Sequence, residues 1–181
     1  MTLTKEQAKE LKKQLREQIM HLPPERRKEA EKQIDSMSSE TLEAMLKQQK
    51  GARQIFRQIA KKEIDSVYVG ENSGAVAVLD INPISRGHIM IVPKKPVVKT
   101  EEIPKEVFLL GEELSKKITS NLGAKSVRLE TDAGLGEAVI HLIPIYDKEL
   151  DKNSPRKSSS PEELQEIKRS IETIKIEKKP K

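Results

Sequence analysis

Asp80, His88 and His141 are the residues of this 181-residue chain whose side chains best suit chemistry at a site. A neutral imidazole acts as a general base or as a nucleophile, and a carboxylate accepts hydrogen bonds from ligand hydroxyls. Each also has a purely structural interpretation. His141 stands alone on an apolar stretch, as a hydrogen-bonded core histidine would, and Asp80 precedes Asn82-Pro83, where it can cap a turn. The residue types leave both interpretations open.

The segments around these residues show two kinds of apolar spacing, one typical of strands and one typical of a helix. Alternating or β-branched runs predict strands at residues 66–69, 75–79, 87–93, 126–130 and 137–145. One helix is predicted at residues 104–121, because apolar residues recur there at helical spacing. We therefore expect an α+β fold in which Asp80 follows one predicted strand and His88 lies near the start of the next.

Further helices are predicted at both ends of the chain. Thr4 to Gln7 form a capping-box pattern before a helix that Pro23-Pro24 ends, and two more helices are expected from Pro24 and from Ser38 or Ser39. Ser160 to Glu163 begin a last helix that is expected to reach about Ile176. The chain thus divides into a helical extension (1–52), a core domain (53–147) and a basic loop with a C-terminal helix (148–181).

The net charge of +5 comes from 34 basic and 29 acidic residues, and its excess lies at the two ends. Segments 1–50 and 148–181 are therefore candidates to contact RNA, a ribonucleoprotein or a protein partner. Interleaved charges also suit ordinary solvated helix faces, and no aromatic residue is interleaved to stack bases. The absence of cysteine excludes a disulfide scaffold and a thiolate zinc site. No run is apolar and long enough for a membrane span, so we expect a cytoplasmic protein.

Two segments resemble the histidine triad (HIT) superfamily. Residues 55–64 (IFRQIAKKEI) are similar to its opening helix, and residues 79–95 (LDINPISRGHIMIVPKK) are similar to its central strand-loop-strand. Residues 160–171 resemble the closing helix of bacterial and archaeal members. The resemblance implies a HIT-like fold, an antiparallel sheet with packed helices, that forms a side-by-side homodimer. It also implies binding of a purine nucleoside monophosphate and its transfer through a covalent nucleotidyl-histidine.

The triad itself departs from the family pattern, which places three histidines at alternate positions on one face of a strand. The pattern Gly-Gln-x-Val-x-His-x-His-x-His aligns without a gap from Gly136 to His141, and Ile143 then stands at the nucleophile. A second register, set by a final His-x-x-Pro, places Val139 there instead. Both registers put an aliphatic side chain at the nucleophile and leave His141 as the only remaining triad histidine.

Other family positions have changed as well. The phosphate-binding Asn falls on Glu130, whose carboxylate would repel a phosphate, and a small polar Ser falls on Ala138. The zinc-binding Cys-x-x-Cys becomes Gln54 and Arg57, which form no thiolate site. The usual tail Trp is missing. We therefore expect neither a metal nor a cofactor.

The nucleoside half of the family site is retained. The resemblance implies nucleotide-binding roles for Ile55, Phe56, Ile59, Val78, Leu79, Asp80, Ile81 and His88. Val78 and Leu79 are expected to line one wall of the base pocket, and Asp80 matches the acid that accepts the ribose hydroxyls. His88 matches a supporting histidine, for which a structural role fits better once the triad is lost.

These observations together predict a catalytically defective HIT-fold protein, dimeric, that interacts through its basic ends. The alternative is a protein that binds AMP or a nucleoside, or a slow nucleotide hydrolase or transferase with His141 as general base on water. Against an enzyme stands the lost stabilisation of the phosphoryl transition state, which is usually the largest catalytic contribution.

Overall fold

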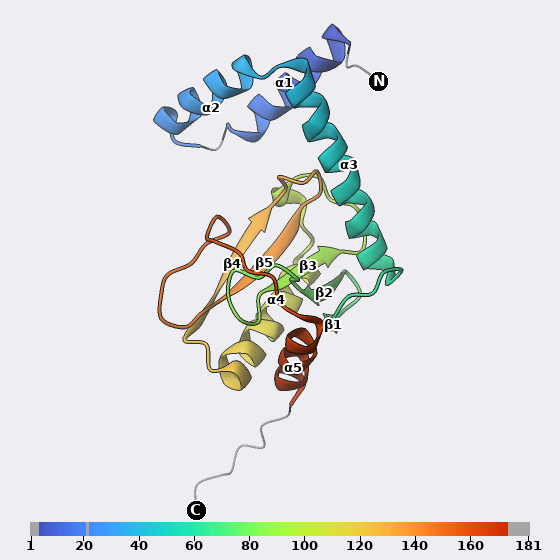
Figure 1. Ribbon diagram of the computed structural model, residues 1–181, viewed down its shortest axis with the longest axis vertical. Helices are drawn as coiled ribbons and strands as arrows, with labels where there is room; N and C mark the ends of the chain where they lie inside the picture. Colours follow the sequence, from blue (N-terminus) through green and yellow to red (C-terminus); the bar gives the residue numbers. More distant parts are fainter. Residues whose placement is uncertain (1–3, 21, 174–181) are drawn as a thin grey trace, which may run out of the picture. The chain divides into compact units, whose positions relative to one another are not determined.

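The computed structural model describes residues 4–20 and 22–173 (Figure 1), so His21 and the expected helix end at residues 174–176 lie outside the described residues. The chain forms two compact units, Met1–Gly51 and Ala52–Lys181. The first unit contains α1 (Lys5–Gln18), α2 (Pro24–Ser36) and the start of α3 (Ser39–Lys61). The helix expected from Ser39 and the one expected at residues 55–64 are thus a single helix of 23 residues.

The second unit is built on a five-stranded antiparallel sheet with the strand order β1-β2-β3-β5-β4. Its strands are β1 (Tyr68–Glu71), β2 (Ala75–Leu79), β3 (Ile89–Pro93), β4 (Ser126–Asp132) and β5 (Val139–Ile145). Each predicted strand is present. Strands β3 and β5 begin two residues later than predicted, because Gly87 and Gly136 adopt left-handed conformations (φ 81° and 87°) that complete the preceding turns.

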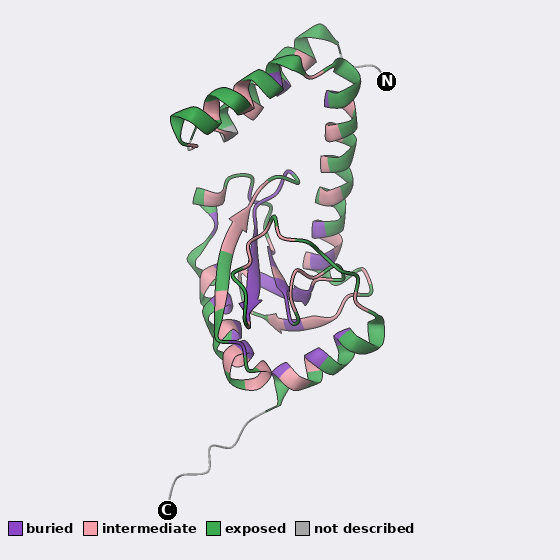
Figure 2. Cartoon of the chain, turned by 60° about the vertical axis from the view of Figure 1, so that its left-hand side comes forward, coloured by how far each residue is buried: buried purple, intermediate pink, exposed green. Residues whose placement is uncertain are grey.

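One face of the sheet packs against α4 (Lys105–Lys117) and α5 (Pro161–Glu172). The main apolar cluster on this face includes Leu79, Ile140 and Leu142 from the strands. The helix predicted to reach residue 121 changes at Ile118 into a π-helical turn, which Gly123 ends with a left-handed φ of 74°. In Figure 2 the buried colour falls on the central strands and on the inner sides of these two helices.

The other face carries a smaller apolar cluster. Phe56 and Ile59 of α3 pack there against Val76, Val78, Val92 and Val139. Every residue of β2 and β5 is buried, because both faces of these strands are covered. Alternate residues of β5 therefore belong to different clusters, with Val139, His141 and Ile143 on the face of the smaller one.

Arg57 ties α3 to the sheet on this second face. Its guanidinium donates to the carbonyls of Pro93 and Lys94, both at 2.8 Å. It also forms an ion pair with Glu137 at 2.7 Å, and the Glu137 side chain is only 6% exposed. One side chain thus links the helix, the end of β3 and the residues just before β5. No helix among the described residues has the length and apolar character that a membrane span needs.

Candidate functional site

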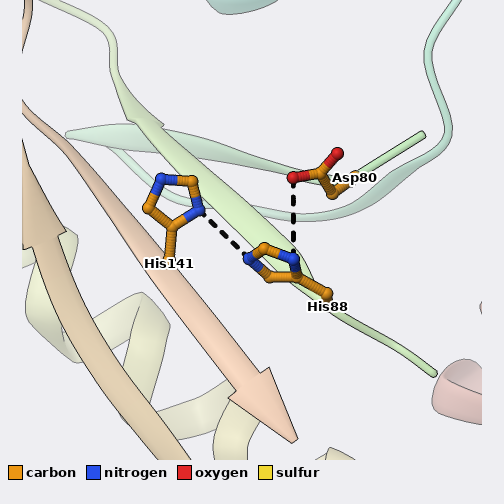
Figure 3. Close-up of side chains that lie close together, drawn as sticks. All are labelled: Asp80, His88 and His141. Carbon is orange, nitrogen blue, oxygen red and sulfur yellow. Dashed lines mark hydrogen bonds and ion pairs between the residues drawn. The ribbon is translucent and has the colours of Figure 1, made fainter. Parts of the chain in front are cut away.

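His88 and His141 form a buried pair on the second face of the sheet. His88 directly precedes β3 and is 1% exposed, and His141 lies in the middle of β5 and is 6% exposed. The pairing of Met90 with His141 brings the two strands together, and Nε2 of His88 lies 3.1 Å from Nδ1 of His141 (Figure 3). The interpretation of His141 as a hydrogen-bonded core residue is therefore realised.

The hydrogen-bond network fixes the tautomer of each ring. The backbone N–H of Ile84 donates to Nδ1 of His88 at 3.2 Å, so that nitrogen carries no proton. A neutral His88 then bears its proton on Nε2 and donates it to Nδ1 of His141. His141 in turn bears its own proton on Nε2. The pair therefore presents an N–H donor, and its remaining lone pairs are already engaged.

Burial keeps both rings neutral near pH 7. It lowers the pKa of His88 to about 4, although the nearby Asp80 carboxylate acts in the opposite direction. Burial also lowers the pKa of His141, against the pull of Asp132. A neutral His141 with its proton on Nε2 can donate a hydrogen bond to a phosphate oxygen, but it is not arranged to remove a proton from water.

Asp80 stands at the edge of the histidine pair, with its Oδ2 at 3.6 Å from Nδ1 of His88. Its Oδ1 accepts from the backbone N–H of Asn82 at 2.9 Å, which is the turn-capping role open from the sequence. Its Oδ2 accepts from Arg156 at 2.7 Å. The side chain is 13% exposed, and each of its oxygens has a protein partner.

The β5 positions on either side of His141, on the same face, are aliphatic. Val139 is 3% exposed and Ile143 is fully buried. The two are the alternative nucleophile positions of the sequence alignment, and neither carries a lone pair. Ala138 belongs to the main cluster, on the opposite face of the sheet.

Acidic residues of β4 lie beside the histidine pair. Glu130 pairs with His141 across the β4–β5 ladder, and its Oε2 accepts from the backbone N–H of Lys152 at 3.1 Å. Asp132 accepts from the Lys152 ammonium at 3.3 Å. The carboxylate expected to repel a phosphate is therefore engaged by the segment that follows β5.

The residues predicted to bind the nucleoside are only partly brought together. Phe56, Ile59 and Val78 share the smaller apolar cluster. Leu79 lies in the main cluster instead, because neighbouring strand residues point to opposite faces, so it does not share a wall with Val78. Ile55 and Ile81 are 49% and 64% exposed.

Asp80, His88 and His141 are also the described residues that best suit a metal, since one donor atom of each lies within 4.8 Å of the others. The fit is poor. The Ile84 amide occupies Nδ1 of His88, and the Arg156 guanidinium occupies Oδ2 of Asp80. A cation would have to displace both, so the network matches a hydrogen-bonded cluster better than a metal centre.

Sequence reasoning did not find Arg156, which contacts the candidate site from a segment predicted only as a loop. Residues 153–159, here called the crossing segment, follow β5 and run along the 80–83 loop. The sequence shows only that this segment is rich in Lys, Ser and Pro, which indicates a loop. It does not indicate which part of the fold the loop contacts. Only the tertiary structure places its guanidinium on Asp80.

Comparison with known proteins agrees with this architecture. The model of the HIT domain matches residues 61–143. The chain is 30% identical over 121 residues to an adenosine 5'-monophosphoramidase of Schizosaccharomyces pombe. The aligned region covers 62% of this chain and 91% of that protein. It is 32% identical over 102 residues to an uncharacterized HIT-like protein of Methanocaldococcus jannaschii, covering 51% and 79% of the two chains.

A solved structure shows the same fold. It is that of a hypothetical histidine triad nucleotide-binding protein from Sulfolobus tokodaii, which superimposes with a TM-score of 0.55 at 25% identity and covers 65% of this chain and 88% of its own. The antiparallel sheet and its packed helices are those expected from the resemblance in the sequence, whereas His88, predicted to lie inside a strand, directly precedes β3. The chain belongs to the HIT family.

Proposed function

We propose that the protein binds a purine nucleoside monophosphate on the second face of the sheet and forms no nucleotidyl-histidine. The observation that carries this proposal is the β5 strand, on which Val139 and Ile143 flank His141. A phosphoryl group can be taken up covalently only by an atom with a free lone pair, and neither side chain offers one. Similarity to relatives such as the S. pombe adenosine 5'-monophosphoramidase supports the nucleotide as ligand.

The nucleoside is to be held by the smaller apolar cluster and by Asp80. Phe56, Ile59 and Val78, which are buried in that cluster, form the apolar side of the proposed site, and Asp80 supplies the acceptor for two ribose hydroxyls. His141 contributes the Nε2 proton as a neutral donor toward the phosphate. This role needs no change of protonation near pH 7, because burial keeps the pKa of His141 below its ordinary value.

The competing function is slow hydrolysis with His141 as general base. The geometry argues against it, since Nδ1 of His141 accepts from His88 and Nε2 is protonated. A base would require a tautomer that breaks the hydrogen bond from the Ile84 amide. The same network therefore favours a ligand-binding role over turnover.

Calorimetric titration with AMP tests the proposal. We expect micromolar binding that Asp80→Ala abolishes and that Glu113→Ala, which removes an exposed carboxylate on α4, leaves unchanged. Adenosine 5'-phosphoramidate should show no turnover. Turnover that disappears in His141→Ala would show an enzyme instead, and absence of heat up to millimolar AMP would show that the fold serves as a scaffold.

A homodimer is proposed on a separate observation. Strand β4 is an edge of the sheet, and exposed apolar residues lie on it and on the neighbouring α4, with Leu129 37% and Leu109 48% exposed. An open edge beside apolar surface favours pairing with a second copy. Light scattering after gel filtration should give twice the chain mass, and Leu109→Lys with Leu129→Lys should give a monomer.

A macromolecular partner at the basic ends, RNA, a ribonucleoprotein or a protein, is a further proposal. Residues 1–51 form a unit of their own, as an interaction module would. Fluorescence anisotropy with a labelled single-stranded RNA at low and physiological salt tests the RNA case, because binding through phosphates weakens steeply as salt rises. Binding that does not change with salt would exclude it.

A further inference from the structure

The crossing segment is held against the 80–83 loop by its main chain. The N–H of Lys157 donates to the carbonyl of Pro83 at 3.1 Å, and the N–H of Ser159 donates to the carbonyl of Ile81 at 3.0 Å. Both bonds are donated by the crossing segment, and the residue number rises along this segment as it falls along the loop, so the two segments lie antiparallel. Ser158 adds a side-chain bond to Asn82 at 2.6 Å. These three bonds fix the register of the segment independently of Arg156.

This register places Arg156 over Asp80. Its Nη1 donates to Oδ2 of Asp80 at 2.7 Å and to the carbonyl of Asn82 at 3.0 Å. The second carboxylate oxygen already accepts from the Asn82 amide. Two ribose hydroxyls would need this same carboxylate, so the guanidinium and a nucleoside compete for one acceptor.

Arg156 can bond strongly to Asp80 and can still leave it for solvent, as a displaceable competitor must. The Asp80 side chain is 13% exposed, whereas the Arg156 side chain is 36% exposed and lies on the solvent side of the pair. A charge-assisted hydrogen bond to a partly buried carboxylate is stronger than one from a neutral hydroxyl. The guanidinium can nevertheless swing into water, where it remains well solvated.

We propose that Arg156 is an internal competitor, here called the latch. It keeps the ribose-binding carboxylate of Asp80 occupied, so that a nucleoside binds only after the guanidinium leaves Asp80. The inference rests on the proposed function, because it concerns the same site. Apparent affinity falls by the fraction of molecules in which the site is free. Removal of the guanidinium should therefore raise the affinity for nucleosides without adding any contact to the ligand.

The test is calorimetric titration of the full chain with AMP and with adenosine. Arg156→Ala should bind both ligands at least about ten-fold more tightly than the wild type, and Arg156→Lys should lie between the two, since one ammonium replaces a planar fork. Lys157→Ala is the matched control. It removes the same charge from the crossing segment and keeps the backbone N–H that bonds to Pro83, so its affinities should equal those of the wild type.

Each outcome decides between the two proposals. Equal or weaker binding by Arg156→Ala, while the wild type binds, overturns the latch and leaves the proposed function standing. Unchanged binding of adenosine with weaker binding of AMP assigns Arg156 to the phosphate and also overturns the latch. Failure of all these proteins to bind either ligand overturns the proposed function and the latch together. Micromolar binding by the wild type with tighter binding by Arg156→Ala supports both. Binding by Arg156→Ala alone supports the latch and overturns nucleotide binding as the function of the wild-type chain.

Discussion

The central strands β2 and β5 are buried on both faces of the sheet, but the two faces are covered by different means. Under α4 and α5 the contacts are apolar, and they are made by aliphatic side chains such as those of Leu79, Ile140 and Leu142. On the other face three specific polar links supplement a small apolar cluster: Arg57 with Glu137, His88 with His141, and Arg156 with Asp80. The stability of the first face depends on the volume and the apolar area that are buried there. That of the second face depends also on the positions of individual polar atoms. We therefore expect the functional site on the second face, where individual polar atoms are held in defined positions.

The largest effect is expected on the apolar face. Leu142→Ala removes a fully buried side chain and should lower the free energy of unfolding by about 4 kcal/mol, through lost transfer energy and a residual cavity. Leu129 pairs with it on β4 but is 37% exposed, so Leu129→Ala should cost less than about 1 kcal/mol. Urea denaturation measures both, and equal losses would contradict the assignment of the main core.

Next comes the link through Arg57. Arg57→Met leaves the Glu137 carboxylate buried without its cation and should cost about 3 kcal/mol. Glu137→Gln should cost clearly less, because Arg57 keeps its two carbonyl acceptors. The comparison of the two variants by thermal or urea unfolding is the measurement. The reverse order of effects would show that the ion pair does not act as the structure indicates.

The histidine pair predicts a pH dependence that the apolar face lacks. The folded pKa of His88, about 4, lies below the value of about 6.5 in the unfolded chain. Its contribution is therefore complete above about pH 6.5 and is lost as the pH falls toward 4. For His88 alone, the free energy of unfolding should drop by about 2 kcal/mol from pH 8 to pH 5. Urea titrations at several pH values test this, with His88→Gln as the control in which the slope should flatten.

The smallest effect is expected at a single hydroxyl. Ser85 Oγ donates to the carbonyl of Pro144 at 2.7 Å and so links the 80–88 loop to β5. Ser85→Ala should lower the free energy of unfolding by about 1 kcal/mol, the usual value for one hydrogen bond. Ser170→Ala on α5 is a matched hydroxyl deletion, since Ser170 Oγ donates to the carbonyl of Glu166 in its own helix. A larger loss at Ser170 than at Ser85 would contradict the role of the link.

The contrast between the faces also marks how far the sequence predicts the molecule. Periodicity was sufficient for the strands and for the α4 and α5 faces, because each apolar residue there needs only the correct side of its element. It did not separate Val78 from Leu79, since both were matched to the family by type and not by strand direction. It did not reveal Arg156 on Asp80 either, because that contact joins residues 76 positions apart through a loop of no regular period.

The position of the histidine pair has a kinetic consequence. Strands β1, β2 and β3 follow one another along the chain, and β4 and β5 form a second local hairpin. Within the described sheet the two pieces are joined by the pairing of β3 with β5, for example Ile89 with Leu142, which closes a loop of about fifty residues. Non-local pairing of this kind slows folding, because the loop entropy is lost before the contacts form. The bond between His88 and His141 bridges this joint, so its formation in a refolding experiment should report the moment at which the two halves of the sheet become one.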